Sequence, residues 1–386
     1  MADFMKKITA RGKSAVASSI TAMKESSTIY SGDPSLHWGT GGWAKNRINV
    51  VYGPTRSGKS AICALAAAQV QQKDGGMIII YDSEYFYKDS PEQVERLSKF
   101  GANIDDVHII SSNKVDELFH GLKDMEEDII SGKMKVSAII VDSWGGIQSE
   151  QAENKLSDNK TSDAGNSFGG NAKLMNPILG VLERISAENG VTTFVVQHCI
   201  KNMEQYGSPY LLLGGERFKY LSHMMLFVEG SQAKDAKLLE GDKTLEKDDK
   251  YDGEIMVGKK ILFRCEKSRK VVEGRKGEFF MNFEECRFAK PEISLFNLAV
   301  NLGVIGHPVN EDGKESIMMW QYPMGPNGLK FKGKANTIST LAEDKILFDK
   351  VMKDCLDINT TEGTSETLSS VGKDEDAPVS SKKGKK

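Results

Sequence analysis

From residue 46 onward, short apolar runs alternate along the chain with longer segments of helical character. The runs are rich in β-branched residues and hold few polar positions: INVVYG, GMIIIYDSE, VHIIS, VSAIIVDS, VTTFVVQH and MMLFVEG. Helix-like segments lie between most of them, at 59–73, 90–100, 113–131 and 173–189. Continuous apolar strands that alternate with helices are typical of a parallel sheet buried on both faces. The pattern therefore predicts an α/β fold with a mostly parallel central sheet.

Two further apolar runs, KKILF and EFFMNF within 259–283, predict an antiparallel hairpin at the sheet edge. The segment 231–258 before them is dense in both signs of charge, and we interpret it as a solvated surface excursion. The core of the protein is thus expected to span 41–290.

The sequence predicts three smaller parts outside this core, one before it and two after it. Residues 1–40 form an N-terminal helical arm that is either a frayed terminus or a docking element for a neighbouring subunit. Residues 291–357 combine the run EISLFNLAVNLG, Gly/Pro-rich turns and a second helix near 338–357, which predicts a small α+β C-terminal subdomain. Residues 358–386 lack aromatic residues and are mostly Ser, Thr, Gly and charged, so we expect a disordered tail.

Composition narrows the class of protein. The 386 residues are 39% hydrophobic and 27% charged, as in soluble globular proteins. No apolar run approaches the roughly 20 residues of a membrane helix, and the N-terminus lacks the apolar stretch of a secretory signal. Five scattered cysteines without a CxxC pair argue against a disulfide framework or zinc site, so a cytoplasmic location is expected. The net charge of −3 means that any nucleic-acid binding must use local patches.

A phosphate-binding motif follows the first strand. The sequence VVYGPTRSGKSAICALAAAQ matches G-x-x-x-x-G-K-[ST] between a strand and a helix, which is the context that this motif requires. Backbone N–H groups of such a loop surround phosphate oxygens, and the helix N-terminus adds partial positive charge. Lysine reaches the β- and γ-phosphates, and the serine hydroxyl ligates Mg²⁺. We therefore predict an ATP site at Gly53, Pro54, Thr55, Arg56, Ser57, Gly58, Lys59, Ser60 and Ala61, with Lys59 catalytic and Ser60 on the metal.

Acidic and polar residues end the neighbouring strands. Asp142 closes VSAIIVDS, where its carboxylate would contact the Mg²⁺ shell. Glu84 lies just past the end of MIIIYDSE and is our candidate for the base that orients and deprotonates the attacking water, with Asp82 as its competitor. His198 ends VVQH, where it either touches the γ-phosphate or is merely a satisfied buried histidine.

An unexplained cluster of cations lies far from this motif along the chain. The stretch CEKSRKVVEGRK, 265–276, joins the two strands of the predicted hairpin and holds five basic residues, Lys267, Arg269, Lys270, Arg275 and Lys276. A solvated hairpin turn could hold such residues without any function.

The ordered set of motifs resembles RecA-type recombinases. GGWAKNRINVVYGPTRSGKS, YDSE, IIVDS, VVQH, GGERFKYLSHMMLFVEG and EKSR follow the order and spacing of that family, most closely that of the UvsX-like recombinases of T-even-type bacteriophages. The resemblance covers roughly 40–356. It implies a helical filament on DNA in which ATP, with Mg²⁺, is bound between adjacent subunits. One face would supply the phosphate loop with Glu84, Asp142 and His198, and the next subunit would supply Lys267 and Arg269 as fingers that stabilise transition-state charge. Lys270, Arg275 and Lys276 would be merely solvated.

The resemblance also implies two DNA-binding loops, at about 148–171 and 199–215. Long irregular segments in compact domains are usually functional or disordered. Aromatic rings and cations there could stack bases and contact phosphates, and the pair of glycines would open a helix whose N-terminus can take a backbone phosphate. The candidate DNA-binding residues are Lys155, Lys160, Lys173, Lys201, Tyr206, Tyr210, Gly214, Gly215 and Arg217.

The sequence therefore predicts a DNA-dependent ATPase that polymerises on single-stranded DNA, pairs it with double-stranded DNA and exchanges strands. A single-strand-binding protein, a recombination mediator and a helicase are the accessory partners that this role implies, in the host cytoplasm if a phage encodes the chain. Two alternatives stay open. A hexameric RecA-fold helicase would share the same residues, although only about 50 residues precede the phosphate motif. A RecA-fold regulator would bind nucleotide and DNA without productive turnover.

Overall fold

The computed structural model describes residues 28–148, 167–201, 210–212, 215–244, 253–309, 313–325 and 327–358, without the side chains of 167–174, 201, 211, 215–217 and 234. The chain forms two compact units, Met1–Ala289 and Lys290–Lys386. No helix in the described part of the chain is long and apolar enough to cross a membrane.

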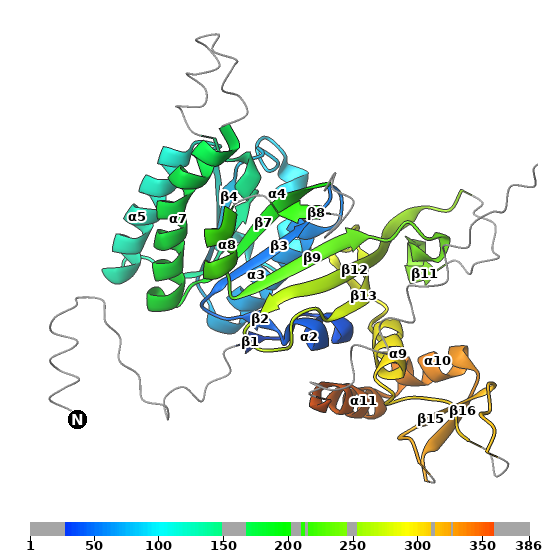
Figure 1. The fold of residues 1–386 in the computed structure, drawn as a ribbon. Coiled ribbons are helices and arrows are strands. Elements are labelled where there is room, and N and C mark those ends of the chain that lie inside the picture. Colours follow the sequence, from blue (N-terminus) through cyan, green and yellow to red (C-terminus); the bar gives the residue numbers. More distant parts are fainter. Residues whose placement is uncertain are drawn as a thin grey trace, which may run out of the picture. The chain divides into compact units, whose positions relative to one another are not determined.

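Six parallel strands form the centre of the first unit (Figure 1). They lie in the order β9–β3–β7–β6–β4–β5, which confirms the predicted α/β fold with a mostly parallel sheet. Their bounds are β3 Ile48–Gly53, β4 Met77–Asp82, β5 Val107–Ser111, β6 Val136–Asp142, β7 Thr192–Lys201 and β9 Met224–Gly230. The inner strands β3 and β6 are buried on both faces. β5 lies at the edge of the sheet, and its residues alternate between half-buried and exposed positions.

Helices cover both faces of this sheet, because successive strand residues point to opposite sides. In β3, Val51 packs with α3 and α4 in one hydrophobic cluster, while Val50 and Tyr52 pack with α5, α7 and α8 in the other. The predicted helical segments are confirmed, and α7 begins earlier than expected. The helices are α3 Lys59–Asp74, α4 Pro91–Lys99, α5 Val115–Ile130, α7 Ser167–Asn189 and α8 Gly215–Leu221. Short 3₁₀ turns lie at Ile104–Asp106, Trp144–Gly146, Lys234–Ala236 and Glu240–Asp242.

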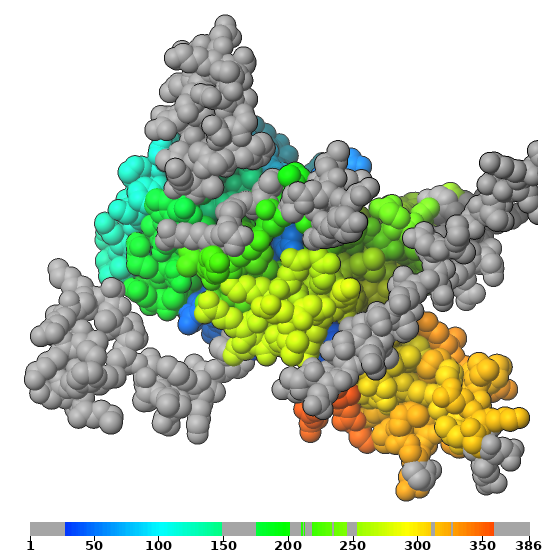
Figure 2. Space-filling model, viewed as in Figure 1, coloured from blue at the N-terminus to red at the C-terminus, as the bar shows by residue number. Residues whose placement is uncertain are grey.

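An antiparallel extension continues the sheet beyond β9. The predicted hairpin is present as β12 Met256–Ser268 and β13 Lys276–Asn282, with β12 antiparallel to both β9 and β13. Figure 2 shows the surface of this hairpin, in yellow-green, on the face turned to the viewer. The remaining strands of the extension are β10 Lys237–Leu239, β11 Lys243–Thr244 and β14 Arg287–Ala289. A further strand, β8 Tyr210–Leu212, pairs with β7 instead.

The interpretation of 231–258 as a solvated excursion is wrong for its first part. Leu238 and Leu239 of β10 are buried, and β10 pairs with both β11 and β12. The charges around them hid this short apolar pair, so the segment adds strands to the sheet.

The chain enters the first unit through a small element that packs on the hairpin. β1 Thr28–Ile29 pairs with β2 Trp43–Ala44, and α2 Pro34–Thr40 lies between them in the sequence. Asp33 caps α2 by accepting hydrogen bonds from the backbone N–H groups of Ser35 and Leu36 at 2.8 and 3.1 Å. Leu36 and Trp38 are buried, so this part of the predicted arm belongs to the core. Residues 1–27 lie outside the described residues.

In its described residues, the second unit has a helical core and one hairpin. Its elements are α9 Pro291–Asn301, β15 Met319–Tyr322, β16 Leu329–Lys332, α10 Lys334–Glu343 and α11 Lys345–Asp357. The single helix predicted near 338–357 is wrong, because Asp344 ends α10 and its side chain caps α11 by accepting from the Leu347 N–H at 3.0 Å. The predicted tail from 359 onward lies outside the described residues.

Candidate active site

The phosphate loop connects the carboxyl end of β3 to the first turn of α3. A Cβ at Gly53 would lie 1.9 Å from the backbone oxygen of Val228, so the close approach of β9 requires glycine there. Gly58 has a left-handed backbone, with φ of 86°, and caps α3. These two positions place the loop residues Pro54 to Gly58 over the N-terminus of a 16-residue helix.

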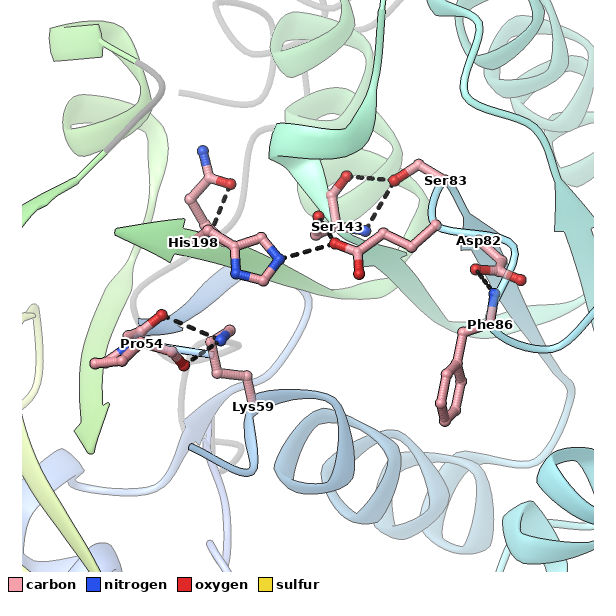
Figure 3. Close-up of polar contacts among 10 residues, drawn as sticks. Pro54, Lys59, Asp82, Ser83, Phe86, Ser143 and His198 are labelled. Atoms are coloured by element: carbon pink, nitrogen blue, oxygen red, sulfur yellow. Dashed lines mark hydrogen bonds and ion pairs between the residues drawn. The ribbon is translucent and has the colours of Figure 1, made fainter. Parts of the chain in front are cut away.

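Lys59 is the first residue of α3 and is folded back onto its own loop. Its Nζ donates to the backbone oxygens of Gly53 at 3.1 Å and Pro54 at 2.7 Å (Figure 3). The residue is only 5% exposed, and burial lowers the pKa of its ammonium group. A buried cation whose partners are neutral carbonyls favours an incoming anion.

The residues expected to hold the metal are adjacent in space. Ser60 lies near Asp142, where its side chain lowers the pKa of the carboxyl, and Asp142 lies next to Asp82 in the register of β6 and β4. Burial raises the pKa of the Asp142 carboxyl to about 6, and the nearby Glu84 and Asp82 carboxylates add to that shift. A buried carboxylate beside a hydroxyl suits Mg²⁺, which binds through one or two protein oxygens with phosphate and water completing its shell. The described residues contain no cluster of three His, Cys, Asp or Glu side chains that could hold a metal ion alone.

Glu84 lies at the mouth of this site with two hydrogen-bond partners. The Nε2 atom of His198 lies 2.8 Å from its Oε1 atom, and the Ser143 hydroxyl donates to the same oxygen (Figure 3). The hydrogen bond to His198 is the main cause that lowers the pKa of Glu84 to about 2. His198 reaches this position because β7 and β3 are neighbours, with Gly53 and His198 in register.

Asp82 has a different environment from Glu84. It is fully buried, and its two carboxylate oxygens accept the backbone N–H groups of Phe86 and Tyr87, each at 2.9 Å. The Asp82 carboxylate therefore holds the loop after β4, and Glu84 is the acid that faces the site.

One cavity of about 570 Å³ contains these groups. The buried hydroxyl of Ser57 in its wall has no hydrogen-bond partner among the described residues, as expected of a group that awaits a ligand oxygen. Aromatic side chains also line the cavity, namely Phe86, Tyr87, Phe100 and Phe283. The predicted residues that line the cavity are Thr55, Arg56, Ser57, Gly58, Lys59, Ser60, Ala61, Glu84, Asp142 and His198.

Lys267 and Arg269 lie apart from this cavity, at the end of β12. The Lys267 Nζ atom donates to the backbone oxygens of Lys219 and, at 3.2 Å, of Tyr220. Arg269 Nη2 donates to the Tyr220 oxygen at 3.5 Å. Both cations thus rest on the carbonyl end of α8, where the helix dipole favours positive charge. Burial, and then the charge of Arg269, lower the pKa of Lys267.

The expectation that Arg275 is merely solvated is wrong. It is 5% exposed, its guanidinium lies 4.4 Å from the centre of the Trp38 ring, and its Nη1 donates to the Trp38 oxygen at 2.6 Å. The Ser268 hydroxyl also donates to the Thr40 oxygen, at 3.1 Å. Arg275 and Ser268 therefore anchor the cationic turn on α2. Lys270 and Lys276 are exposed, as expected.

Four of the nine predicted DNA-binding residues lie outside the described residues, namely Lys155, Lys160, Tyr206 and Gly214. Lys173 lies in α7 and Lys201 at the end of β7, and Gly215 and Arg217 lie in the first turn of α8, with their side chains not described. Tyr210 is in β8, where its hydroxyl donates to Glu229 Oε1 at 2.8 Å and its ring lies 5.3 Å from that of Phe227. In this structure Tyr210 thus contacts the sheet, and the second loop is shorter than expected because β7 and β8 extend into it.

The sequence reasoning missed several residues of the site, among them Ser143 and Lys259. Ser143, which binds Glu84, follows Asp142 directly, so its position at the strand end was an available signal. Lys259 lines the cavity from β12 and is separated by 203 positions from the loop residue Arg56 that it contacts, so no local pattern could reveal it.

Comparisons with known proteins agree with this geometry. A family model, the RecA N-terminal domain, matches residues 3–248, which is more than half of the chain. The Protein RecA of Chlorobium chlorochromatii (strain CaD3) is 27% identical over 334 residues, covering 86% of this chain and 81% of that protein. The Protein RecA of Chlorobium limicola (strain DSM 245 / NBRC 103803 / 6330) is 26% identical over 90% of this chain and 87% of its own length. That of Staphylococcus carnosus (strain TM300) is 30% identical over a shorter stretch, 56% of this chain and 58% of its own.

Proposed function

This chain belongs to the RecA family, and we propose that its ATPase site is completed by Lys267 and Arg269 of a neighbouring chain in a filament on DNA. As a RecA-type recombinase it is a DNA-dependent ATPase that uses ATP with Mg²⁺. What is proposed is the role of each residue and the way in which neighbouring chains share the site.

The placement of the two cations carries this proposal. Ser268 pairs with Met224 of β9, which pairs with Asn49 of β3, so the cations lie toward the amino end of β3. Gly53 and the phosphate loop lie at the opposite end of β3. At about 3.3 Å per residue along a strand and about 4.8 Å between strands, these positions are roughly 13 Å apart along the sheet and 10 Å across it. Neither cation lines the cavity of its own chain, so a phosphate that they contact would belong to another chain.

A site divided in this way produces a polymer. The phosphate loop is on one surface and the cations are on another, so the contact between chains is heterologous. Heterologous contacts generate a closed ring or an open helix. RecA-family membership favours the helical filament over the ring of the helicase alternative.

Within each site, this chain's own residues would have separate roles. Lys59 and the loop N–H groups bind the phosphates, Ser60 and Asp142 hold Mg²⁺, and Glu84 orients the attacking water and takes its proton. A carboxylate with a pKa near 2 is a poor proton acceptor. We infer that His198 must leave Glu84 for the γ-phosphate, because loss of that hydrogen bond raises the pKa of Glu84 toward a useful range.

The contact of the cations with α8 supports the dependence of hydrolysis on DNA. α8 begins directly after the second predicted DNA loop, and its last carbonyls hold Lys267 and Arg269. DNA bound on that loop would shift α8 and release the cations toward the neighbour. The candidate DNA-binding residues of both loops belong to this proposal.

We also propose a phage origin, on the motif series from GGWAKNRINVVYGPTRSGKS to EKSR, although the relatives named above are bacterial. A single-strand-binding protein, a recombination mediator or a helicase in the same cytoplasm would then be its accessory partners.

The test combines imaging with hydrolysis. Electron microscopy of the full chain with long single-stranded DNA and a slowly hydrolysed ATP analogue should show continuous helical filaments. Lys267→Ala should lower DNA-dependent hydrolysis by about 10³-fold, since trans-acting cations contribute at that scale, and should keep nucleotide binding by the free chain. Lys276→Ala, an exposed lysine of the same hairpin, serves as the control. Closed rings, or normal hydrolysis by Lys267→Ala, would contradict the proposal.

A further inference from the structure

A single strand joins this chain's phosphate site to the cations that it offers to the next chain. Met256, Val257, Gly258 and Lys259, at the start of β12, line the ATP cavity, while Lys267 lies near its end. β12 pairs with β13 over Gly258–Arg264 and with β9 over Ile261–Ser268. At least one edge of the strand is hydrogen-bonded over Gly258–Ser268, with a register shift between Cys265 and Lys267 in the pairing with β9. A displacement at the start of β12 is therefore expected to pass along its hydrogen-bonded length.

Lys259 connects the start of this strand to the phosphate loop. Its Nζ atom donates to the backbone oxygen of Arg56 at 2.5 Å. Arg56 has a φ of 62°, a left-handed backbone that a side chain other than glycine rarely adopts. A charge-assisted hydrogen bond to its carbonyl therefore stabilises a conformation that is otherwise unfavourable.

Neighbouring residues leave room for the Lys259 side chain and pack against it. A Cβ at Gly230 would lie 2.5 Å from the Lys259 Nζ atom, so the side chain occupies space that exists only because this residue is glycine. The Phe283 ring lies below it, with its centre 6.0 Å from Nζ. No carboxylate of the described residues forms an ion pair with Lys259, which lines the cavity. Burial, and then the charge of Arg56, lower the pKa of its ammonium group.

We propose that Lys259 is a positioning residue that holds the phosphate loop through the Arg56 carbonyl, so that β12 couples the nucleotide site of each chain to the next one. This inference rests on the proposed function only in its second half, the coupling through Lys267 and Arg269. Phosphate bound in the loop shifts the loop carbonyl and attracts the Lys259 ammonium group. The paired strand carries that displacement to the cations at its other end, which act on the neighbour's phosphate.

Two substitutions on adjacent positions test this role. Lys259→Met keeps the unbranched stem and removes the charge. Lys260→Met is the matched control, because Lys260 points to the other face of β12, where it lies 3.5 Å from Glu278 and 3.7 Å from Asp235. Binding of a fluorescent ATP analogue to the free chain, without DNA, should weaken about tenfold in Lys259→Met, as expected for a lost hydrogen bond from a charged group. It should stay within about twofold in the control.

Steady-state hydrolysis on single-stranded DNA supplies the second readout. Lys259→Met should raise the half-saturating ATP concentration and lower the Hill coefficient toward 1. A merely structural lysine would lower the melting temperature without changing the Hill coefficient. Unchanged analogue binding, or an equal loss in Lys260→Met, would overturn the positioning role. Weakened binding with an unchanged Hill coefficient would overturn the coupling through β12.

The outcomes separate this inference from the proposed function. Analogue binding by the free chain needs no neighbour, so it tests the Lys259 contact even if the shared site is wrong. Normal hydrolysis by Lys267→Ala would contradict both the shared site and the coupling through β12. It would not contradict the role of the Lys259 contact with Arg56.

Discussion

At the end of β4, two carboxylates that are two residues apart have opposite surroundings. Asp82 is buried and saturated by backbone N–H groups, whereas Glu84 is 44% exposed and bound to His198 and Ser143. Sequence alone left both acids as candidates for the base. The structure separates them because the chain turns back over Asp82 after β4. The backbone N–H groups of Phe86 and Tyr87 in that turn need an acceptor, and Asp82 supplies it.

The first residue-scale prediction concerns Glu84→Gln. The amide keeps the size of the side chain and a hydrogen-bonding oxygen but cannot accept the proton of the attacking water. ATP binding should persist, and DNA-dependent turnover should fall by about 10²-fold or more, the usual contribution of a general base. Asp82→Asn is the control: it should lower thermal stability through loss of one backbone contact and leave kcat within a few-fold. Unchanged turnover in Glu84→Gln would exclude it as the base.

The second residue-scale prediction follows from the raised pKa of Asp142. Its carboxyl has a pKa of about 6 in the folded chain against an ordinary value of 3.8. The folded state therefore keeps a proton that the unfolded state has lost, and stability decreases as the pH rises from about 4 to 6. Above that range the ionised carboxylate destabilises the fold, and below it the effect is absent.

Asp142→Asn removes this buried charge and keeps an oxygen for the Ser60 hydroxyl. The free energy of unfolding of the nucleotide-free chain should rise by on the order of 2 kcal/mol near neutral pH and by nothing near pH 3.5. Urea denaturation at both pH values checks the sign. Mg²⁺-dependent ATP hydrolysis should be lost in the same variant. Equal stabilisation at both pH values would show that burial does not raise this pKa.

At the residue scale, the sequence revealed the groups that a local motif fixes. Lys59, Ser60 and Asp142 could be predicted because each stands at a defined place after a buried strand. Lys259 could not, since its contact with Arg56 depends on where β12 lies in the finished sheet. Arg275 was misjudged for the same reason: only the position of Trp38 on α2 shows that this one cation of the turn is buried.

At the element scale, apolar periodicity predicted the six parallel strands and the helices between them. It failed where charge or a cap interrupted the pattern. The charged surroundings of Leu238 and Leu239 concealed β10, whose burial depends on pairing with β12. Asp344 splits the predicted C-terminal helix, and an aspartate three residues before Leu347 was a usable capping signal.

The hairpin of β12 and β13 connects the ATP cavity to the cations at the turn. α2 holds its turn through Arg275 and Ser268, and β12 carries Lys259 at one end and Lys267 at the other. The predicted docking arm, residues 1–40, includes α2. An arm that docks on a neighbour would therefore act on the same turn that presents the cations.

At the scale of the whole molecule, bulk charge says little about DNA binding. The net charge of −3 is spread over 51 basic and 54 acidic residues, so only local grouping matters. The order of the motifs along the chain was more informative, because the strands bring the phosphate loop, Glu84, Asp142 and His198 to one edge of the sheet. The DNA contacts could not be placed in this way, since most of both loops lies outside the described residues.

Sharing of the site between chains predicts complementation in mixed filaments. Glu84→Gln chains lack the base but keep their cations, and Lys267→Ala chains lack a cation but keep the base. Each variant alone should be nearly inactive. In a random equal mixture, about a quarter of the heterologous contacts combine the phosphate site of a Lys267→Ala chain with the cations of a Glu84→Gln chain. DNA-dependent hydrolysis should therefore recover to about a quarter of the wild-type rate.

The matched control is a mixture of Glu84→Gln with the double variant Glu84→Gln, Lys267→Ala, in which no contact has both groups. Electron microscopy should show filaments of similar length in both mixtures, because both variants are expected to bind ATP. Recovery only in the first mixture requires Lys267 to act on the phosphate of another chain. If both mixtures stay inactive while filaments form, Lys267 acts within its own chain, and the distance between the cations and the phosphate loop must then be closed by movement of β12 itself.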